Sequence, residues 1–92
     1  MILTFKCSLT RQLFEGQRIA RYRNIERVAR RKLLILHAAV SLRNLSIPPG
    51  NRLEELVGNR AGQHSIRIND QWRICFVWKN EGVHGVEIVN YH

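Results

Sequence analysis

The last three residues of the chain, Asn90, Tyr91 and His92, follow the apolar stretch 86–89 and place an amide, a phenol and an imidazole at the expected end of a strand. An imidazole has an ordinary pKa of roughly 6.5, so it can accept and donate protons near neutral pH. The neighbouring aromatic ring offers a surface on which an RNA base can stack. This tail is therefore a candidate active centre for cleavage of a phosphodiester.

The net charge of the chain indicates a polyanionic partner. Lys and Arg together number 15 against 7 Asp and Glu, which gives a formal charge of +8 at pH 7. Most of these cations are arginines, whose guanidinium groups stay protonated and offer two parallel donors to a phosphate. Contact with nucleic acid is therefore expected, although ribosomal and other RNA-bound proteins share this composition.

Length and cysteine usage restrict the class of protein. The 92 residues suffice for a single domain, residues 1–92, with a modest core. Cys7 and Cys75 lack metal-ligand spacing, which favours two buried free thiols, since a disulfide would need an oxidising compartment. The N-terminus has no signal-peptide segment, and no apolar run approaches the ~20 residues of a membrane span. We therefore expect a cytoplasmic protein without a metal or a cofactor.

The first half of the chain predicts two helices. Ser8 or Thr10 can cap a short helix that ends at Gly16. Asn24 is the expected N-cap of a longer helix that reaches about Val40. Four basic residues lie mostly off the apolar face of this second helix: Arg27, Arg30, Arg31 and Lys32. They form either a solvated surface or a contact with an RNA backbone.

The second half of the chain has the two-residue period of strands, which residues 2–7 also show. After Pro48-Pro49-Gly50 ends any helix, four strands are expected, over residues 52–56, 63–68, 72–79 and 83–90. Asn69 and Asp70 predict a two-residue hairpin turn. The resulting fold class is α+β, with two N-terminal helices packed on one face of an antiparallel sheet.

Strand pairing predicts which polar side chains can meet. Arg67 and Arg73 flank one turn on neighbouring strands. The last strand returns antiparallel and brings its C-terminal end near Trp72, so Arg73 and His92 can be neighbours. A shift of one residue in register would reverse every face.

The remaining histidines and the tryptophans are interpreted as structural. His64 is expected to be a hydrogen-bonded structural residue, and His37 and His84 are expected at the surface. Trp72 and Trp78 share one strand face and are expected in the core rather than as platforms for RNA bases.

Five segments together resemble a known family: Pro48–Leu53, Gly58–Gln63, Ser65–Asn69, Gln71–Phe76 and Glu87–His92. They closely resemble HigB-type toxins of the RelE superfamily, the plasmid maintenance or killer proteins of bacterial type II toxin-antitoxin pairs. The resemblance implies a fold like that of microbial ribonucleases and an endoribonuclease that cuts mRNA in the ribosomal A site. It also implies a HigA-like antitoxin with a helix-turn-helix domain, through which the pair binds operator DNA.

The resemblance assigns roles to individual positions. Arg73 matches the family's phosphate-binding arginine, Tyr91 its base-stacking or proton-relay tyrosine, and His92 its terminal acid or base. Cleavage without a metal needs a base for the 2′-hydroxyl, cations for the phosphoryl oxygens and an acid for the departing 5′-oxygen. The expected RNA-binding residues are Arg52, Arg60 and Arg67.

The chain departs from the family pattern near the proposed site. Related toxins commonly carry an acidic residue where this chain has Asn90, which cannot ionise. Some relatives have a histidine where this chain has Glu54 and a lysine where it has Val57. Glu54 is either a substitute base or a surface residue.

Three functions therefore stay open. The first is a ribosome-dependent endoribonuclease. The second is a weakly active or inactive relative that serves as antitoxin partner and corepressor. The third is a ParE-like inhibitor of another target such as DNA gyrase, against which the terminal Tyr91-His92 pair argues, because relatives of that kind generally lack it.

Overall fold

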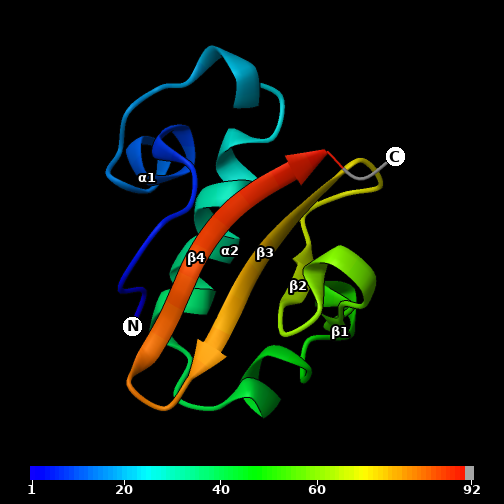
Figure 1. Ribbon diagram of the computed structural model, residues 1–92. Helices are drawn as coiled ribbons and strands as arrows, with labels where there is room; N and C mark the ends of the chain where they lie inside the picture. Colours follow the sequence, from blue (N-terminus) through cyan, green and yellow to red (C-terminus); the bar gives the residue numbers. More distant parts are fainter. Residues whose placement is uncertain (91–92) are drawn as a thin grey trace.

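The computed structural model describes residues 1–90, which form two α-helices on one face of a four-stranded antiparallel sheet (Figure 1). The helices are α1 (Ser8–Phe14) and α2 (Glu26–Ala38). The strands, in the order in which they lie side by side, are β1 (Glu54–Glu55), β2 (His64–Arg67), β3 (Trp72–Lys79) and β4 (Gly82–Asn90). Short 3-10 helices connect them: η1 (Ala20–Tyr22), η2 (Leu42–Leu45), η3 (Pro49–Asn51) and η4 (Gly58–Arg60). The predicted α+β fold is confirmed.

The helices form where the sequence predicts them, but the start of α1 and both ends of α2 differ. The N-cap of α1 is Cys7, without a side-chain cap, rather than Ser8 or Thr10. The helix already begins at Ser8, and the Thr10 hydroxyl accepts the Ile88 N–H at 3.0 Å instead. α1 is followed by Gly16, whose φ of 100° lets the chain turn away from the helix, as predicted. The N-cap of α2 is Ile25 rather than Asn24. Asn24 cannot cap because it lies inside a turn that the Ile25 N–H closes on the Tyr22 carbonyl at 3.0 Å. α2 ends at Ala38, before the predicted Val40.

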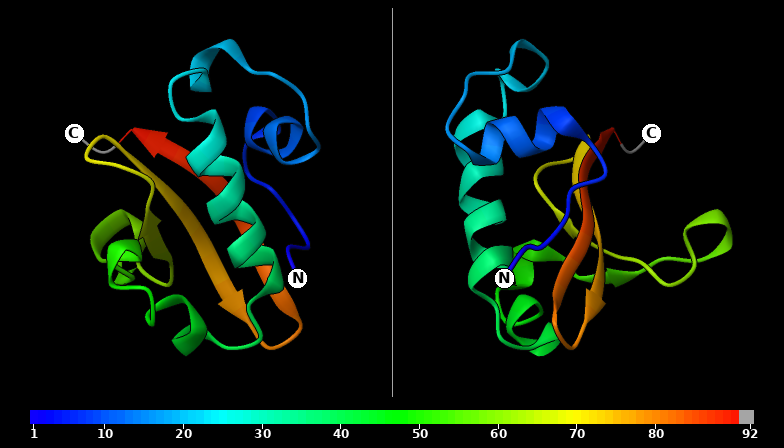
Figure 2. Two further views of the ribbon diagram at one scale, coloured as in Figure 1. Left: turned by 180° about the vertical axis from the view of Figure 1, so that it is seen from behind. Right: turned by 60° about the vertical axis from the view of Figure 1, so that its left-hand side comes forward.

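The hydrophobic core fills the space between the helices and the sheet, and both views of Figure 2 show α2 lying along one face of the strands. Its fully buried members include Leu13, Tyr22, Ala29, Leu33, Leu36, Ile66, Ile74, Phe76, Val83 and Val86. Trp72 and Trp78 are half-buried and pack against this cluster, with the Trp72 ring edge-on to Tyr22 at 5.6 Å. Their predicted contact with the core is confirmed, but neither ring is fully buried within it.

The N-terminal segment pairs with β4 without becoming a regular strand. Ile2 and Phe5 form isolated parallel bridges with Val83 and Val86. β4 also carries an irregularity in its pairing with β3, where Gly85 has a φ of 61°. Such a bulge bends the strand locally, and glycine adopts the positive φ without steric cost.

Two connections differ from the sequence-based prediction. The turn between β2 and β3 spans residues 69–71 rather than two residues, because Oδ1 of Asn69 accepts the backbone N–H groups of Gln71 and Trp72, each at 2.8 Å. β1 contains two residues rather than the predicted five. It cannot begin at Arg52, since that residue is left-handed, with φ 44° and ψ 57°.

One basic residue of α2 joins the two helices. Arg30 donates from Nε to the Leu13 carbonyl at 3.0 Å and from Nη2 to the Gln17 carbonyl at 2.6 Å. These carbonyls lie at and just beyond the C-terminal end of α1, where the helix dipole favours a cation. Arg30 is therefore a structural residue, whereas Arg27 and Arg31 are exposed, as the solvated-surface interpretation predicts.

Replacing Arg30 tests this helix–helix contact. Arg30→Met removes the hydrogen bonds to the Leu13 carbonyl of α1 and to the Gln17 carbonyl beyond it, and should lower the free energy of unfolding by about 1–2 kcal/mol, because hydrogen bonds from charged donors are worth more than neutral ones. Urea denaturation followed by circular dichroism measures the change. Arg27→Met, the same substitution at an exposed position, should stay within about 0.5 kcal/mol of the unmodified chain. Equal stability of the two variants would contradict the contact.

Candidate active site

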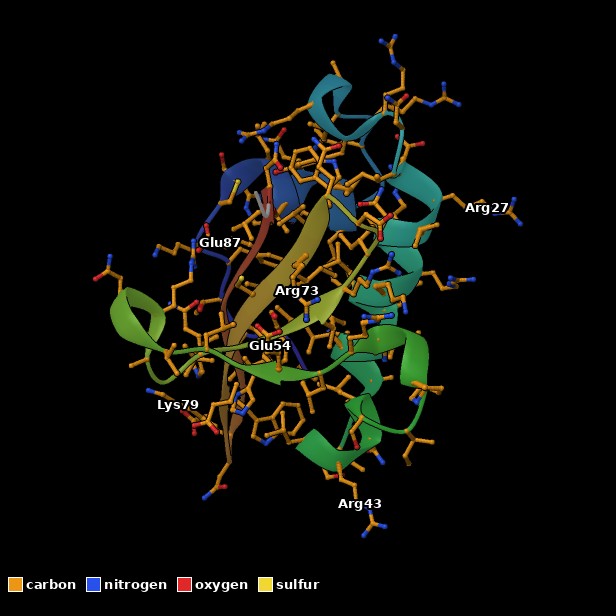
Figure 3. All side chains as sticks on the ribbon, turned by 90° about the vertical axis from the view of Figure 1, so that its right-hand side faces the viewer. Arg27, Arg43, Glu54, Arg73, Lys79 and Glu87 are labelled. Atoms are coloured by element: carbon orange, nitrogen blue, oxygen red, sulfur yellow. The ribbon has the colours of Figure 1, made fainter. Side chains whose placement is uncertain are left out.

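The polar candidates gather on the sheet face opposite the helices. Cross-strand pairing places one row of residues across all four strands: Glu54, Ser65, Cys75 and Glu87. The adjacent row consists of Arg67, Arg73 and Val89. Members of the two rows are two residues apart along each strand, so they project from the same face. The predicted place of Arg67 and Arg73 beside one turn on neighbouring strands is confirmed, and the two residues are direct cross-strand partners. Figure 3 shows the labelled side chains of Arg73 and Glu54 near one another.

Arg73 is the best-fixed cation on this face. Only 7% of its surface is exposed, which is rare for arginine. Its Nε donates to Oγ of Ser65 at 2.8 Å, and its Nη2 donates to the backbone carbonyls of Arg52 at 2.6 Å and Ser65 at 3.3 Å. These three acceptors fix the plane of the guanidinium.

The three predicted RNA-binding arginines differ in exposure and in ion pairing. Arg52 is exposed. Nη1 of Arg60 lies 3.0 Å from Oε2 of Glu87, and Nη2 of Arg67 pairs with Oδ1 of Asp70. Partly exposed ion pairs of this kind contribute at most about 1 kcal/mol, so a phosphate group can replace the carboxylate.

The end of β4 lies beside the start of β3, as predicted. Val89 is paired with Arg73, and Asn90 with Trp72. Because strand side chains alternate, Asn90 belongs to the pleat face of Trp72 rather than to that of Arg73. Tyr91 and His92 lie outside the described residues, so their assigned roles and the proximity of His92 to Arg73 stay predictions.

Two histidines differ from their predicted environments. The His64 ring stacks on Phe76 with centroids 6.2 Å apart, and its Nδ1 is buried without a hydrogen-bond partner among residues 1–90. The prediction of a hydrogen-bonded His64 is therefore wrong for this nitrogen. His37 is half-buried rather than at the surface, because its Nδ1 accepts the Ile2 N–H at 3.1 Å.

Both cysteines are free thiols, as predicted, but only Cys75 is buried. Burial raises the pKa of Cys75 above its ordinary value. Burial also acts to raise the pKa of Cys7, but hydrogen bonds from Thr10, Tyr22 and Leu9 outweigh it, and the net pKa lies below the ordinary value. Among residues 1–90, no group of three or more His, Cys, Asp and Glu side chains is arranged to hold a metal ion.

The sequence pattern does not predict the polar roles of three buried residues: Ser65, which accepts from Arg73, and the hydrogen-bonded pair Lys32 and Asn51. Ser65 lies one strand away and two residues before Arg67, so the correct register would have placed it beside Arg73. The prediction that Lys32 belongs to a solvated surface or an RNA contact is wrong, because Lys32 lies one turn before Leu36 on the buried side of α2 and is 9% exposed. That helical spacing is the signal for its burial.

Neither helix within residues 1–90 combines the length and apolar content that crossing a bilayer requires.

The sheet with helices on one face and a fixed arginine on the other is consistent with a RelE-like toxin. Residues 3–92 match the family described as the RelE-like toxin of type II toxin-antitoxin system HigB, and the chain belongs to that family. The resemblance predicted from the sequence is thereby confirmed.

Two relatives are similar in sequence. Toxin HigB-1 of Vibrio cholerae serotype O1 is 43% identical over 93 residues, which cover 99% of this chain and 94% of the relative. An uncharacterized protein of Haemophilus influenzae is 33% identical over 63 residues, which cover 68% of this chain and 62% of that protein.

The two thiols should react with iodoacetamide at different rates. The thiolate is the nucleophile, so the lowered pKa and partial exposure of Cys7 favour its alkylation near pH 7.5, whereas Cys75 is protected by burial and by its raised pKa. Peptide mass spectrometry after a short pulse should find label on Cys7, and labelling in urea should reach both residues. Faster labelling of Cys75 in the folded protein would show that the outer face of the sheet is more open than described.

Proposed function

We propose that this toxin is an endoribonuclease that cleaves mRNA on the ribosome by acid–base chemistry without a metal. The observation that carries the proposal is the buried, oriented guanidinium of Arg73 on the helix-free face, one residue pair away from the end of β4. Membership of the HigB-like family supports it, because toxins of this superfamily are generally endoribonucleases. The proposed site is cytoplasmic and is reached by RNA over an open surface.

Arg73 supplies electrostatic stabilisation in the proposed reaction. Attack of the 2′-hydroxyl on the adjacent phosphorus places growing negative charge on the phosphoryl oxygens, and a pre-oriented cation stabilises that charge without reorganising. His92 donates a proton to the departing 5′-oxygen, while Tyr91 stacks on a base or relays a proton. Glu54, on the face of Arg73, accepts the proton of the 2′-hydroxyl, and the products are a 2′,3′-cyclic phosphate and a free 5′-hydroxyl.

Arg52, Arg60 and Arg67 bind the RNA backbone in this proposal. Arg60 and Arg67 exchange their carboxylate partners for phosphates, which releases counterions from the RNA. The proposed protein partner is a HigA-like antitoxin with a helix-turn-helix domain, and operator DNA is bound only through that antitoxin.

One observation favours a second candidate function. Asn90 stands where related toxins carry an acidic side chain, and an amide can neither ionise nor stabilise a nearby imidazolium by charge. A weakly active or inactive toxin that serves as antitoxin partner and corepressor fits that replacement.

Substituting Arg73 and His92 tests the ribonuclease proposal. Arg73→Lys keeps the charge but loses the forked donors, and should lower the cleavage rate on purified ribosomes about 10²-fold. His92→Asn removes the proton-transfer group and should lower it roughly 10²- to 10⁴-fold. Primer extension on the mRNA measures both rates.

The matched control is Arg43→Lys, the same chemical change at an exposed position of η2, which should cleave at the unmodified rate. Melting temperatures show whether Arg73→Lys folds. Full activity of both site variants would remove these residues from the mechanism. Growth arrest without any RNA cleavage would point instead to a ParE-like target.

Restoring the acidic residue separates the two candidate functions. Asn90→Asp should raise the cleavage rate about tenfold, because a carboxylate favours the charged imidazolium of a neighbouring histidine. Asn80→Asp makes the same change in the exposed turn before β4 and should have no effect. Cleavage that is absent from the unmodified chain but present in Asn90→Asp would support the inactive relative. Absence from both would contradict the ribonuclease proposal.

A further inference from the structure

A short loop connects the helical layer to the arginine of the candidate site. Lys32 lies on α2 with 9% of its surface exposed, and its Nζ donates a hydrogen bond to Oδ1 of Asn51. Asn51 is fully buried in η3, and its Nδ2 donates to the Leu45 carbonyl at 3.1 Å. Both polar ends of Asn51 are thus held, one by the helix and one by the start of the loop 45–52.

The next residue makes the contact with the site. Arg52 is the only non-glycine residue within residues 1–90 that has a positive φ. A left-handed conformation is unfavourable for a residue with a Cβ atom, so the surrounding structure must maintain it. Its carbonyl accepts a hydrogen bond from Nη2 of Arg73 at 2.6 Å. The left-handed conformation of Arg52 therefore directs its carbonyl oxygen toward the guanidinium of Arg73.

We propose that Lys32 and Asn51 are positioning residues for Arg73. Lys32 holds Asn51, Asn51 holds the loop, and the loop presents the Arg52 carbonyl to the guanidinium opposite Ser65. The inference rests on the proposed ribonuclease function for its catalytic consequence, but its structural part concerns Arg73 alone. Lys32 and Asn51 act through Arg73 and belong to the layer behind the site.

The chemistry of Lys32 supports positioning over simple packing. An apolar side chain would fill this place on α2 without needing an acceptor. An ammonium group is costly there: burial lowers the pKa of Lys32, and the positive charges of Arg31 and Arg67 lower it further. A lysine at this place supplies a directional hydrogen bond to Asn51 that no apolar residue can make.

The first test measures Arg73 without RNA. In Lys32→Met the Arg52 carbonyl is less firmly held, so hydrogen exchange of the Arg73 Nη2 protons, which donate to that carbonyl and are observed by NMR, should become about tenfold faster. Arg27→Met is the matched control, because it removes the same charge from an exposed position on the same helix. Figure 3 shows the Arg27 side chain pointing away from the molecule. The control should leave the exchange rate unchanged.

The second test measures coupling in catalysis. Lys32→Met should lower the single-turnover rate of mRNA cleavage about tenfold at saturating substrate, with little change in substrate affinity. In the Arg73→Lys background the same substitution should change the rate less than about twofold, since a positioning residue has no effect once its target is altered. A purely structural loss would lower both backgrounds equally.

Asn51→Asp keeps the experiment informative if Lys32→Met does not fold. The aspartate still accepts from Lys32 but cannot donate to the Leu45 carbonyl, so Arg73 exchange should again accelerate. Unchanged exchange in the folded variants overturns the positioning role. Equal losses of cleavage in both Arg73 backgrounds also overturn it. If the unmodified chain does not cleave mRNA, the proposed function fails, while the exchange rates still decide the positioning of Arg73.

Discussion

Burying the guanidinium of Arg73 costs free energy that only well-placed oxygen acceptors recover. Moving a charged group out of water carries a penalty of several kcal/mol, and an acceptor that is displaced leaves that penalty uncompensated. Here the acceptors include the hydroxyl and carbonyl of Ser65 and the carbonyl of Arg52. The position of β2 beside β3 and the shape of the loop 45–52 are therefore both coupled to one side chain.

The two faces of the sheet differ in chemistry. One face packs Ile66, Ile74 and Phe76 against the helices, and the other carries the polar rows that contain Arg73. The segment around η4 projects away from the sheet in the right-hand view of Figure 2, and Arg60 ties it back to Glu87 of β4. The apolar face thus builds the core, while the polar face holds β2, β3 and the loop 45–52 together through Arg73.

The sequence predicts the features that depend on periodic patterns. Alternation along β2 and β3 places Arg67 and Arg73 on neighbouring strands beside one turn, and the spacing of apolar residues places α2 against the sheet. The exact pairing of Arg67 with Arg73 depends on the length of that turn. The length of the 69–71 turn and the left-handed Arg52 are not predictable in this way, because each depends on one side chain meeting a specific backbone group. Asn69 lengthens the turn by accepting two backbone N–H groups, a choice that composition alone does not reveal.

The candidate site likewise contains residues that the sequence predicts and residues that it does not. Family resemblance and register suffice to select Arg73, whereas its supports depend on contacts between residues far apart in the chain. Lys32 is the clearest case, since its basic character predicts exposure, whereas the structure buries it on the core side of α2. Its lowered pKa means that the folded state holds the proton less readily than the unfolded chain does, so the charge opposes folding. A residue that opposes folding in this way is better explained by the geometry it imposes on Asn51 than by a contribution to stability.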